Sequence, residues 1–186
     1  MNVLIVGGSF NPPHIGHIWA AQQVFESHSM HEVWFMPNYS SKNYSSKRLV
    51  NSVHRLAMCK LLIKDFASDS SDSFYIKVSN IELQRQFKYT YQTVDYLTKN
   101  FSHINFSWVI GSDWDITKFK NHTRILEKCN VINISRNGYC DTDIKQKFEF
   151  KISSTDIRNR IRYKQKITGL VTPSVVDYIH KHKLYL

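Results

Sequence analysis

Short runs of apolar residues alternate along the chain with segments whose apolar positions recur at helical spacing. The runs have the length of strands buried on both faces, which is typical of parallel sheets. They predict strands over residues 3–6, 32–36, 74–79, 106–110, 130–135 and 148–152. Helices are predicted from His14 onward, over 50–63 and 91–101, and after Thr172, where a capping residue precedes Pro173. The alternation predicts an α/β fold: a doubly wound parallel sheet covered by helices, with ligands outside the carboxyl ends of its strands.

Length and composition limit the classes of function. The 186 residues suit a single domain over 1–186 with a helical C-terminal portion from about residue 153. The net charge of +10 suits anionic partners, but the basic residues are spread out and form no aromatic-basic recognition motif, so nucleic acid is not expected. The apolar runs are too short for a membrane span or a signal peptide, and the three cysteines lack zinc-site spacing. We therefore expect a cytoplasmic protein with reduced thiols and no membrane partner.

A turn with two histidines follows the first predicted strand, in the segment Gly7-Gly8-Ser9-Phe10-Asn11-Pro12-Pro13-His14-Ile15-Gly16-His17. The paired glycines allow a sharp turn, and a helix start carries unpaired N–H groups and the positive end of the helix dipole. Residues three apart share a helix face, so the imidazoles of His14 and His17 can contact one anion, and phosphate favours their protonated form. The segment predicts a phosphate site, and the alternative is a capped turn with two surface histidines.

A second helix start of this kind lies in Ile152-Ser153-Ser154-Thr155-Asp156-Ile157-Arg158. Its hydroxyls and amides suit phosphate, and Arg158 lies one turn in, where its guanidinium can bind phosphate oxygens. The alternative is a capped helix with a surface arginine. After the strand over 106–110, Asp113 either accepts from ribose hydroxyls or caps a helix. Neither Gly-x-Gly-x-x-Gly nor Gly-Lys-Ser/Thr follows a predicted strand, which argues against the dinucleotide-binding and P-loop classes.

The two blocks resemble the His-x-Gly-His and Ile-Ser-Ser-Thr-x-Ile-Arg motifs of the nucleotidyltransferase superfamily. Nearly the whole chain is similar to bacterial nicotinate-mononucleotide adenylyltransferases, through further segments in the same order at 33–38, 51–55, 89–94, 110–113 and 135–138. The resemblance implies a Rossmann-like sheet of the nucleotidyltransferase type. It also implies transfer of the adenylyl group of ATP to nicotinate mononucleotide, giving deamido-NAD and pyrophosphate. Since no nucleophile motif or carboxylate cluster is evident, we expect direct in-line attack, with Mg²⁺ arriving on ATP and no metal site in the protein.

The resemblance assigns roles to individual residues. The catalytic pair is His14 and His17. The expected ATP-binding residues are Gly8, Ser9, Phe10, His14, His17, Ser153, Ser154, Thr155 and Arg158. The residues expected to bind the ribose or the mononucleotide are Gly111, Asp113, Thr90, Phe119, Arg136, Lys42 and Lys47.

The chain departs from the family pattern in the first motif and in the loop after Asn38. Ser9 and Asn11 replace the usual threonine and aspartate, which keeps polar character but removes one carboxylate. The loop lacks the usual Pro-Pro-His-Lys/Arg. The cations in it that could face the acceptor are Lys42, Lys47 and Arg48.

Several matching residues also have a structural interpretation. Phe119 lies where the family often has a tryptophan, and it either stacks on the pyridine ring or belongs to the core. His54 and Arg55 match a family position but sit within an amphipathic helix, where a structural role is favoured.

Other functions keep some support from the sequence. Phosphopantetheine adenylyltransferases share both phosphate motifs but lack the Trp-Phe-Met-Pro-Asn and Gly-Ser-Asp context found here. A cytidylyltransferase of the same superfamily is a weaker alternative. Outside the enzymes, a basic RNA-binding protein on the same fold would show salt-dependent RNA binding. A homo-oligomer is compatible with the sequence.

Overall fold

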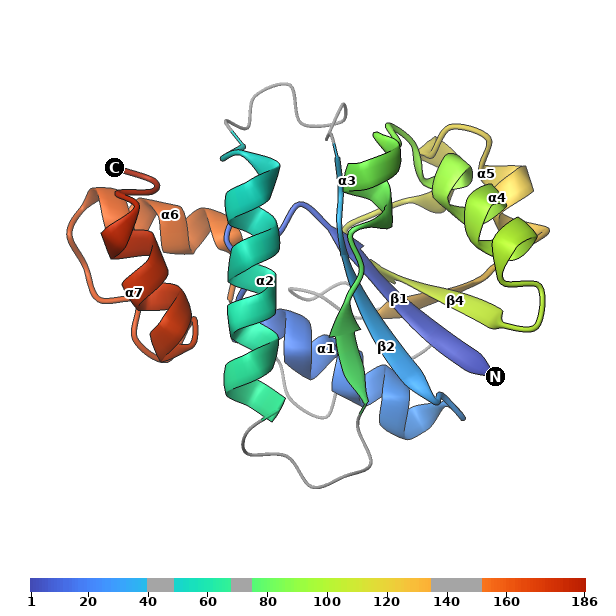
Figure 1. Cartoon of the computed structure of the whole chain (residues 1–186), viewed down its shortest axis with the longest axis horizontal. Helices are drawn as coiled ribbons and strands as arrows, with labels where there is room; N and C mark the ends of the chain where they lie inside the picture. Colours follow the sequence, from blue (N-terminus) through green and yellow to red (C-terminus); the bar gives the residue numbers. More distant parts are fainter. Residues whose placement is uncertain (40–48, 68–74, 135–151) are drawn as a thin grey trace.

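Five parallel strands form one sheet in the order β3-β2-β1-β4-β5 (Figure 1). The computed structural model describes residues 1–39, 49–67, 75–134 and 152–186. The strands are β1 (Asn2–Gly8), β2 (Glu32–Pro37), β3 (Ile76–Val78), β4 (Asn105–Gly111) and β5 (Asn130–Ile134). This sheet confirms the predicted doubly wound fold. Residues 148–151 of the expected last strand lie outside the described residues, and Ile152 is not part of a strand.

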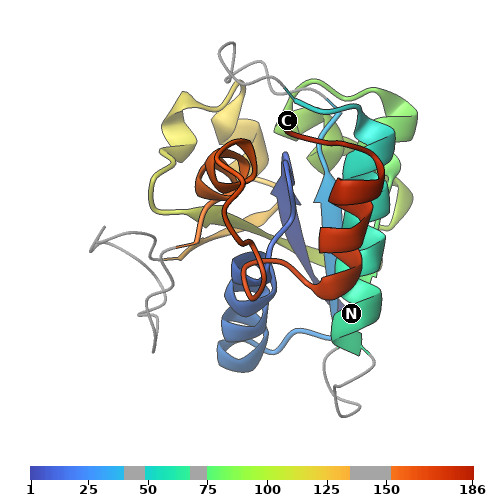
Figure 2. The same cartoon turned by 90° about the vertical axis from the view of Figure 1, so that its left-hand side faces the viewer.

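Helices cover both faces of the sheet. One face carries α1 (Ile15–Ser27), α2 (Ser52–Ala67), α6 (Ser154–Arg162) and α7 (Pro173–Lys181), and the other carries α4 (Thr90–Asn100) and α5 (His122–Leu126). Figures 1 and 2 show α7 lying alongside α2. Three short helices were not predicted: α3 (Ile81–Arg85), the 3-10 helix η1 (Ile116–Lys118) and α5. No helix of the described segments has the length and apolar character needed to cross a membrane.

The central strand β1 packs against a core on each side. Leu4 and Val6 belong to the core under α1 and α2, whereas Val3 and Ile5 belong to the core under α4. Because a central parallel strand has no solvent-facing side, its apolar run is continuous instead of alternating. The strand order reverses between β1 and β4, and ligands of such sheets bind in the crevice outside the carboxyl ends at this point.

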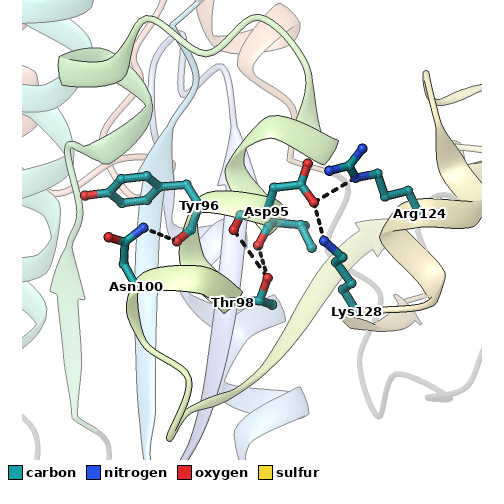
Figure 3. Close-up of polar contacts among 7 residues, drawn as sticks. Asp95, Tyr96, Thr98, Asn100, Arg124 and Lys128 are labelled. Atoms are coloured by element: carbon teal, nitrogen blue, oxygen red, sulfur yellow. Dashed lines mark hydrogen bonds and ion pairs between the residues drawn. The ribbon is translucent and has the colours of Figure 1, made fainter.

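Asp95 ties α4 to α5 on the second face of the sheet (Figure 3). One carboxylate oxygen of Asp95 accepts hydrogen bonds from Arg124 Nε at 2.9 Å and from Lys128 Nζ at 2.7 Å. Burial opposes ionisation of Asp95, but these cationic partners outweigh it and lower its pKa. The contact fixes α4, which begins at Thr90, relative to α5.

Candidate active site

The turn between β1 and α1 lies at the point where the strand order reverses. Gly7 passes so close to β4 that an added Cβ would collide with the ring of Trp108. Phe10 adopts a left-handed backbone with a φ of 45°, which is uncommon for a bulky residue. Its buried ring packs 5.4 Å from the ring of Phe35 and 4.9 Å from that of His17, measured between centroids. The turn is therefore held in an unusual conformation by packing from both sides.

The two histidines of the first motif lie against each other at the start of α1. Their ring centroids are 3.7 Å apart, His14 is buried, and His17 is half-buried. The backbone N–H of His14 donates to Nδ1 of His17 at 3.1 Å. A nitrogen that accepts a hydrogen bond carries no proton, so His17 in this arrangement is a neutral imidazole with its proton on Nε2. The protonated form expected from the sequence is the one that a bound phosphate would favour, and it stays a prediction.

Gly16 has a steric role between the histidines. A Cβ at this position would lie 3.0 Å from Nδ1 and 3.2 Å from Cε1 of His14. Glycine therefore leaves the room that the His14 ring needs, which gives a physical reason for the glycine of the His-x-Gly-His pattern.

The expectation that the start of α1 offers unpaired amides to phosphate is wrong for its first residues. The N–H of His14 is bound by His17, and the N–H of Ile15 donates to the carbonyl of Leu170 at 3.1 Å. At the start of α6, by contrast, Ser153 Oγ caps only the amide of Asp156, at 3.1 Å. Among the described residues, no acceptor is recorded for the amides of Ser154 and Thr155. The first two amides of α1 are therefore occupied, whereas the first two amides of α6 are free within the described segments.

The structure brings the two motifs into direct contact. Ser154 Oγ donates to the carbonyl of Pro12 at 2.8 Å, and Arg158 Nη1 donates to the carbonyl of Asn11 at 2.8 Å. Arg158 Nη2 also donates to Thr155 Oγ1 at 3.1 Å. Burial lowers the pKa of the half-buried Arg158, but a guanidinium stays charged in proteins. Histidines, hydroxyls and one arginine thus gather at one edge of the sheet.

The residues expected on the acceptor side are placed less completely. Gly111 is the last residue of β4, the neighbour of β1, and the exposed Asp113 follows this strand. The Trp114 N–H donates to the Gly111 carbonyl at 2.9 Å. Half-buried Phe119 contacts Trp114 edge to face at 5.9 Å and packs against the core under α4. Thr90 is half-buried at the first position of α4. The cations expected on this side, which lie outside the described residues, are Arg136, Lys42, Lys47 and Arg48.

Arg55 is the residue near the turn whose connections sequence reasoning missed. Its side chain is only 1% exposed, and it donates to the carbonyl of Ser9 at 2.8 Å. Its match to a family position within a predicted amphipathic helix was the available signal, but the sequence does not reveal its partners.

The site offers no cage for a metal ion within the described segments. No group of three or more histidine, cysteine, aspartate or glutamate side chains is gathered there in a way that could hold one. The donors around the turn are imidazoles, hydroxyls and guanidinium groups, which suit phosphate oxygens.

Comparison with known proteins connects this geometry to a family. Residues 5–160 match the model of the cytidylyltransferase-like family. A protein of Oceanobacillus iheyensis named probable nicotinate-nucleotide adenylyltransferase is 32% identical, over 97% of this chain and 95% of its own length. The nicotinate-nucleotide adenylyltransferase of Bacillus subtilis is 31% identical, over 97% of this chain and 96% of its own length.

A solved structure shares the fold. The nicotinic acid mononucleotide adenylyltransferase of Plasmodium falciparum, complexed with NaAD, superposes with a TM-score of 0.81 at 22% identity. The match covers 99% of this chain and 97% of that chain. The likeness confirms the Rossmann-like architecture.

Proposed function

The chain belongs to the cytidylyltransferase-like family, and from this membership and its full-length relatives we infer that it is an adenylyltransferase of NAD biosynthesis. It transfers the adenylyl group of ATP to nicotinate mononucleotide, and the products are deamido-NAD and pyrophosphate. The observation that carries this function is the contact between the two phosphate motifs, made by Ser154 with Pro12 and by Arg158 with Asn11.

His14 and His17 are the proposed catalytic pair. The 5′-phosphate of the mononucleotide attacks the α-phosphorus of ATP, and the bond to pyrophosphate breaks on the opposite side. Negative charge then accumulates on the phosphate oxygens, and prepositioned donors stabilise it more in the transition state than in the ground state. His17 is oriented to donate from Nε2, since Nδ1 is bound by the His14 amide. The protein supplies position and hydrogen bonds and forms no covalent intermediate.

Residues of the second motif bind the leaving pyrophosphate in this proposal. The amides at the start of α6 and the guanidinium of Arg158 suit the β- and γ-phosphates. Arg158 is already oriented by Asn11 and Thr155, so little side-chain entropy is lost when ATP binds. The backbone of the turn lies against the same phosphates, through Gly8, Ser9 and Phe10.

On the acceptor side, we assign Gly111 and Asp113 to a ribose and Thr90 and Phe119 to the pyridine ring. The cations proposed for the mononucleotide are Arg136, Lys42 and Lys47. Nicotinate carries a carboxylate where nicotinamide carries a neutral amide, so positive charge and helix-start amides favour the acid.

Nucleotidyltransferases of this kind use a divalent metal together with ATP. We propose Mg²⁺, bound by the triphosphate and therefore part of the substrate, because the described residues form no carboxylate cage. We further propose that residues 1–186 act as a single domain in the cytoplasm.

The test compares nicotinate mononucleotide with nicotinamide mononucleotide at saturating ATP and Mg²⁺. We expect kcat/KM for nicotinate mononucleotide, which gives deamido-NAD, to be much higher than kcat/KM for nicotinamide mononucleotide, which gives NAD. A buried donor that meets the wrong group discriminates strongly. Equal use of both acceptors would overturn the proposed acceptor site alone. If neither mononucleotide gave a dinucleotide and phosphopantetheine gave a product, the proposed function would be overturned.

A further inference from the structure

Arg55 in α2 is a fully buried cation behind the phosphate turn. Its Nη1 donates to the carbonyl of Ser9 at 2.8 Å and to Asn38 Oδ1 at 3.2 Å, while Nη2 donates to the carbonyl of Asn38 at 2.7 Å. Its Nε donates to the carbonyl of Val50 at 3.2 Å. One side chain therefore connects the ends of β1 and β2 with the segment that leads into α2.

The bond to Ser9 sets the direction of the next amide. The only cis peptide of the described residues is Asn11–Pro12, so the Ser9–Phe10 peptide is trans and its C=O and N–H point in opposite directions. With the Ser9 carbonyl turned inward to Arg55, the Phe10 N–H is turned away from Arg55. Within the described part of the chain, no acceptor for this N–H is recorded. The same bond supports the left-handed backbone of Phe10, since it fixes one of the two peptides that flank this residue.

A second peptide is held from both of its sides. Arg55 binds the carbonyl of Asn38, and the N–H of the same peptide bond, which belongs to Tyr39, donates to the carboxylate of buried Glu82. Glu82 is itself bound by Thr93 Oγ1 at 2.6 Å. The chain is thus fixed at residues 38 and 39, where it leaves β2.

Burial makes Arg55 costly for the fold. Within the described residues no carboxylate lies within ion-pair distance of its guanidinium, whose partners are carbonyl oxygens and one amide oxygen. Buried Glu82 attracts the guanidinium from beyond ion-pair distance, but this attraction and the hydrogen bonds only partly replace the hydration that burial removes. Apolar packing of equal volume is often at least as stable. Burial also lowers the pKa of Arg55, which reflects the same cost. Stability alone therefore does not explain an arginine here.

We propose that Arg55 is a positioning residue for adenylyl transfer, which holds the Ser9–Phe10 and Asn38–Tyr39 peptides and thereby directs the Phe10 amide to the phosphates of the reacting substrates. The proposal rests on the proposed function. Arg55 itself does not contact substrate in this proposal. Its role depends on the planar geometry of the guanidinium and not on the charge alone. A lysine keeps the charge but cannot reach several carbonyls with a planar fork.

The experiment compares Arg55→Lys and Arg55→Met with the control His54→Ala. His54 neighbours Arg55 on α2 but contacts α7, where its Nδ1 lies 3.0 Å from the hydroxyl of Tyr178.

For each variant we would measure the unfolding temperature, kcat and KM for both substrates, and hydrogen–deuterium exchange of peptides spanning residues 8–11 and 37–39. We expect kcat to fall on the order of 10²-fold in Arg55→Met and at least about tenfold in Arg55→Lys, with smaller changes in KM, because misplacement of reacting groups acts on the chemical step. Exchange in the two peptides should accelerate.

His54→Ala should lower the unfolding temperature while kcat stays within about twofold of the wild type and exchange in both peptides is unchanged. An Arg55→Lys variant with wild-type kcat would overturn the proposal, because charge would then suffice. Loss of kcat that merely follows the unfolded fraction, or failure of both Arg55 variants to fold, would show a purely structural role and would also overturn it. If the wild type forms no dinucleotide, the proposed function fails by itself, and unchanged exchange at the two peptides would still contradict the role of Arg55.

Discussion

Replacement of Arg158 by alanine is expected to weaken ATP much more than nicotinate mononucleotide. Arg158 projects from α6 over the turn after β1, where Nη1 binds the carbonyl of Asn11 and Nη2 binds Thr155 Oγ1. These bonds use two of the five guanidinium donors, so three N–H groups stay available to phosphate oxygens.

The magnitude follows from the kind of bond that is lost. A hydrogen bond to a charged group contributes about 1.5 to 3 kcal/mol, so the Kd for ATP should rise about 10- to 150-fold in Arg158→Ala. Alanine also removes the donor of the carbonyl of buried Asn11, so the unfolding temperature of the variant is measured together with the Kd. The Kd for nicotinate mononucleotide should change by less than about threefold. Arg158→Lys should fall between, because lysine keeps the charge without the planar fork.

The assay is isothermal titration of each substrate separately, with Arg160→Ala as the matched control. Arg160 lies on the same helix, two residues or about 200° around the axis, and its Nε binds Asp156 at 2.8 Å. This control should leave the Kd for ATP within about twofold of the wild type. Equal weakening of both substrates by Arg158→Ala, or equal weakening of ATP by the two alanine variants, would refute the placement of Arg158 at the triphosphate.

Three further predictions concern the turn and the buried carboxyl behind it. His17→Asn keeps an acceptor near the position of Nδ1 for the His14 amide, so the unfolding temperature should be nearly unchanged. It removes the Nε2 donor, so turnover should fall on the order of 10² to 10³-fold. Near-normal turnover would contradict the catalytic role. Gly16→Ala places a methyl 3.0 Å from Nδ1 of His14, so kcat should fall at least about tenfold, although alanine favours the helix. A wild-type kcat would show that the position of the His14 ring is unimportant. Burial raises the pKa of Glu82 to about 7, so the folded chain binds this proton at higher pH than the unfolded chain and loses stability as pH rises from about 4.5 to about 7. Glu82→Gln should gain up to about 3 kcal/mol over the wild type across that interval in urea unfolding, and a difference independent of pH would contradict the shift.

Sequence patterns predicted the parts of the fold that repeat over enough residues. The continuous apolar run in β1 and the helical spacing in α1 and α2 indicated the sheet and its helices correctly, because burial on both faces of a strand and on one side of a helix leaves a periodic record. The helices α3 and α5 have five residues each, too few to complete a recognisable period, and their formation depends on packing against the sheet.

The candidate site shows the same division. The local features of the first motif predicted two adjacent imidazoles, and the structure places His14 and His17 together. The occupied amide of Ile15 was not foreseeable, because its acceptor, the carbonyl of Leu170, is distant in the sequence. The same holds for Arg55, whose partners belong to the ends of two strands. Such contacts depend on the tertiary fold and leave no local spacing in the sequence.

The most direct test of the central claim follows the phosphorus atoms of ATP. The protein would be incubated with nicotinate mononucleotide, Mg²⁺ and ATP labelled at either the α- or the γ-phosphorus. In-line transfer of the adenylyl group predicts that the α-label appears in deamido-NAD and the γ-label in pyrophosphate, in equal amounts and only when the mononucleotide is present. An α-label that remains in ATP, becomes attached to the protein, or enters product only when phosphopantetheine replaces the mononucleotide would contradict it.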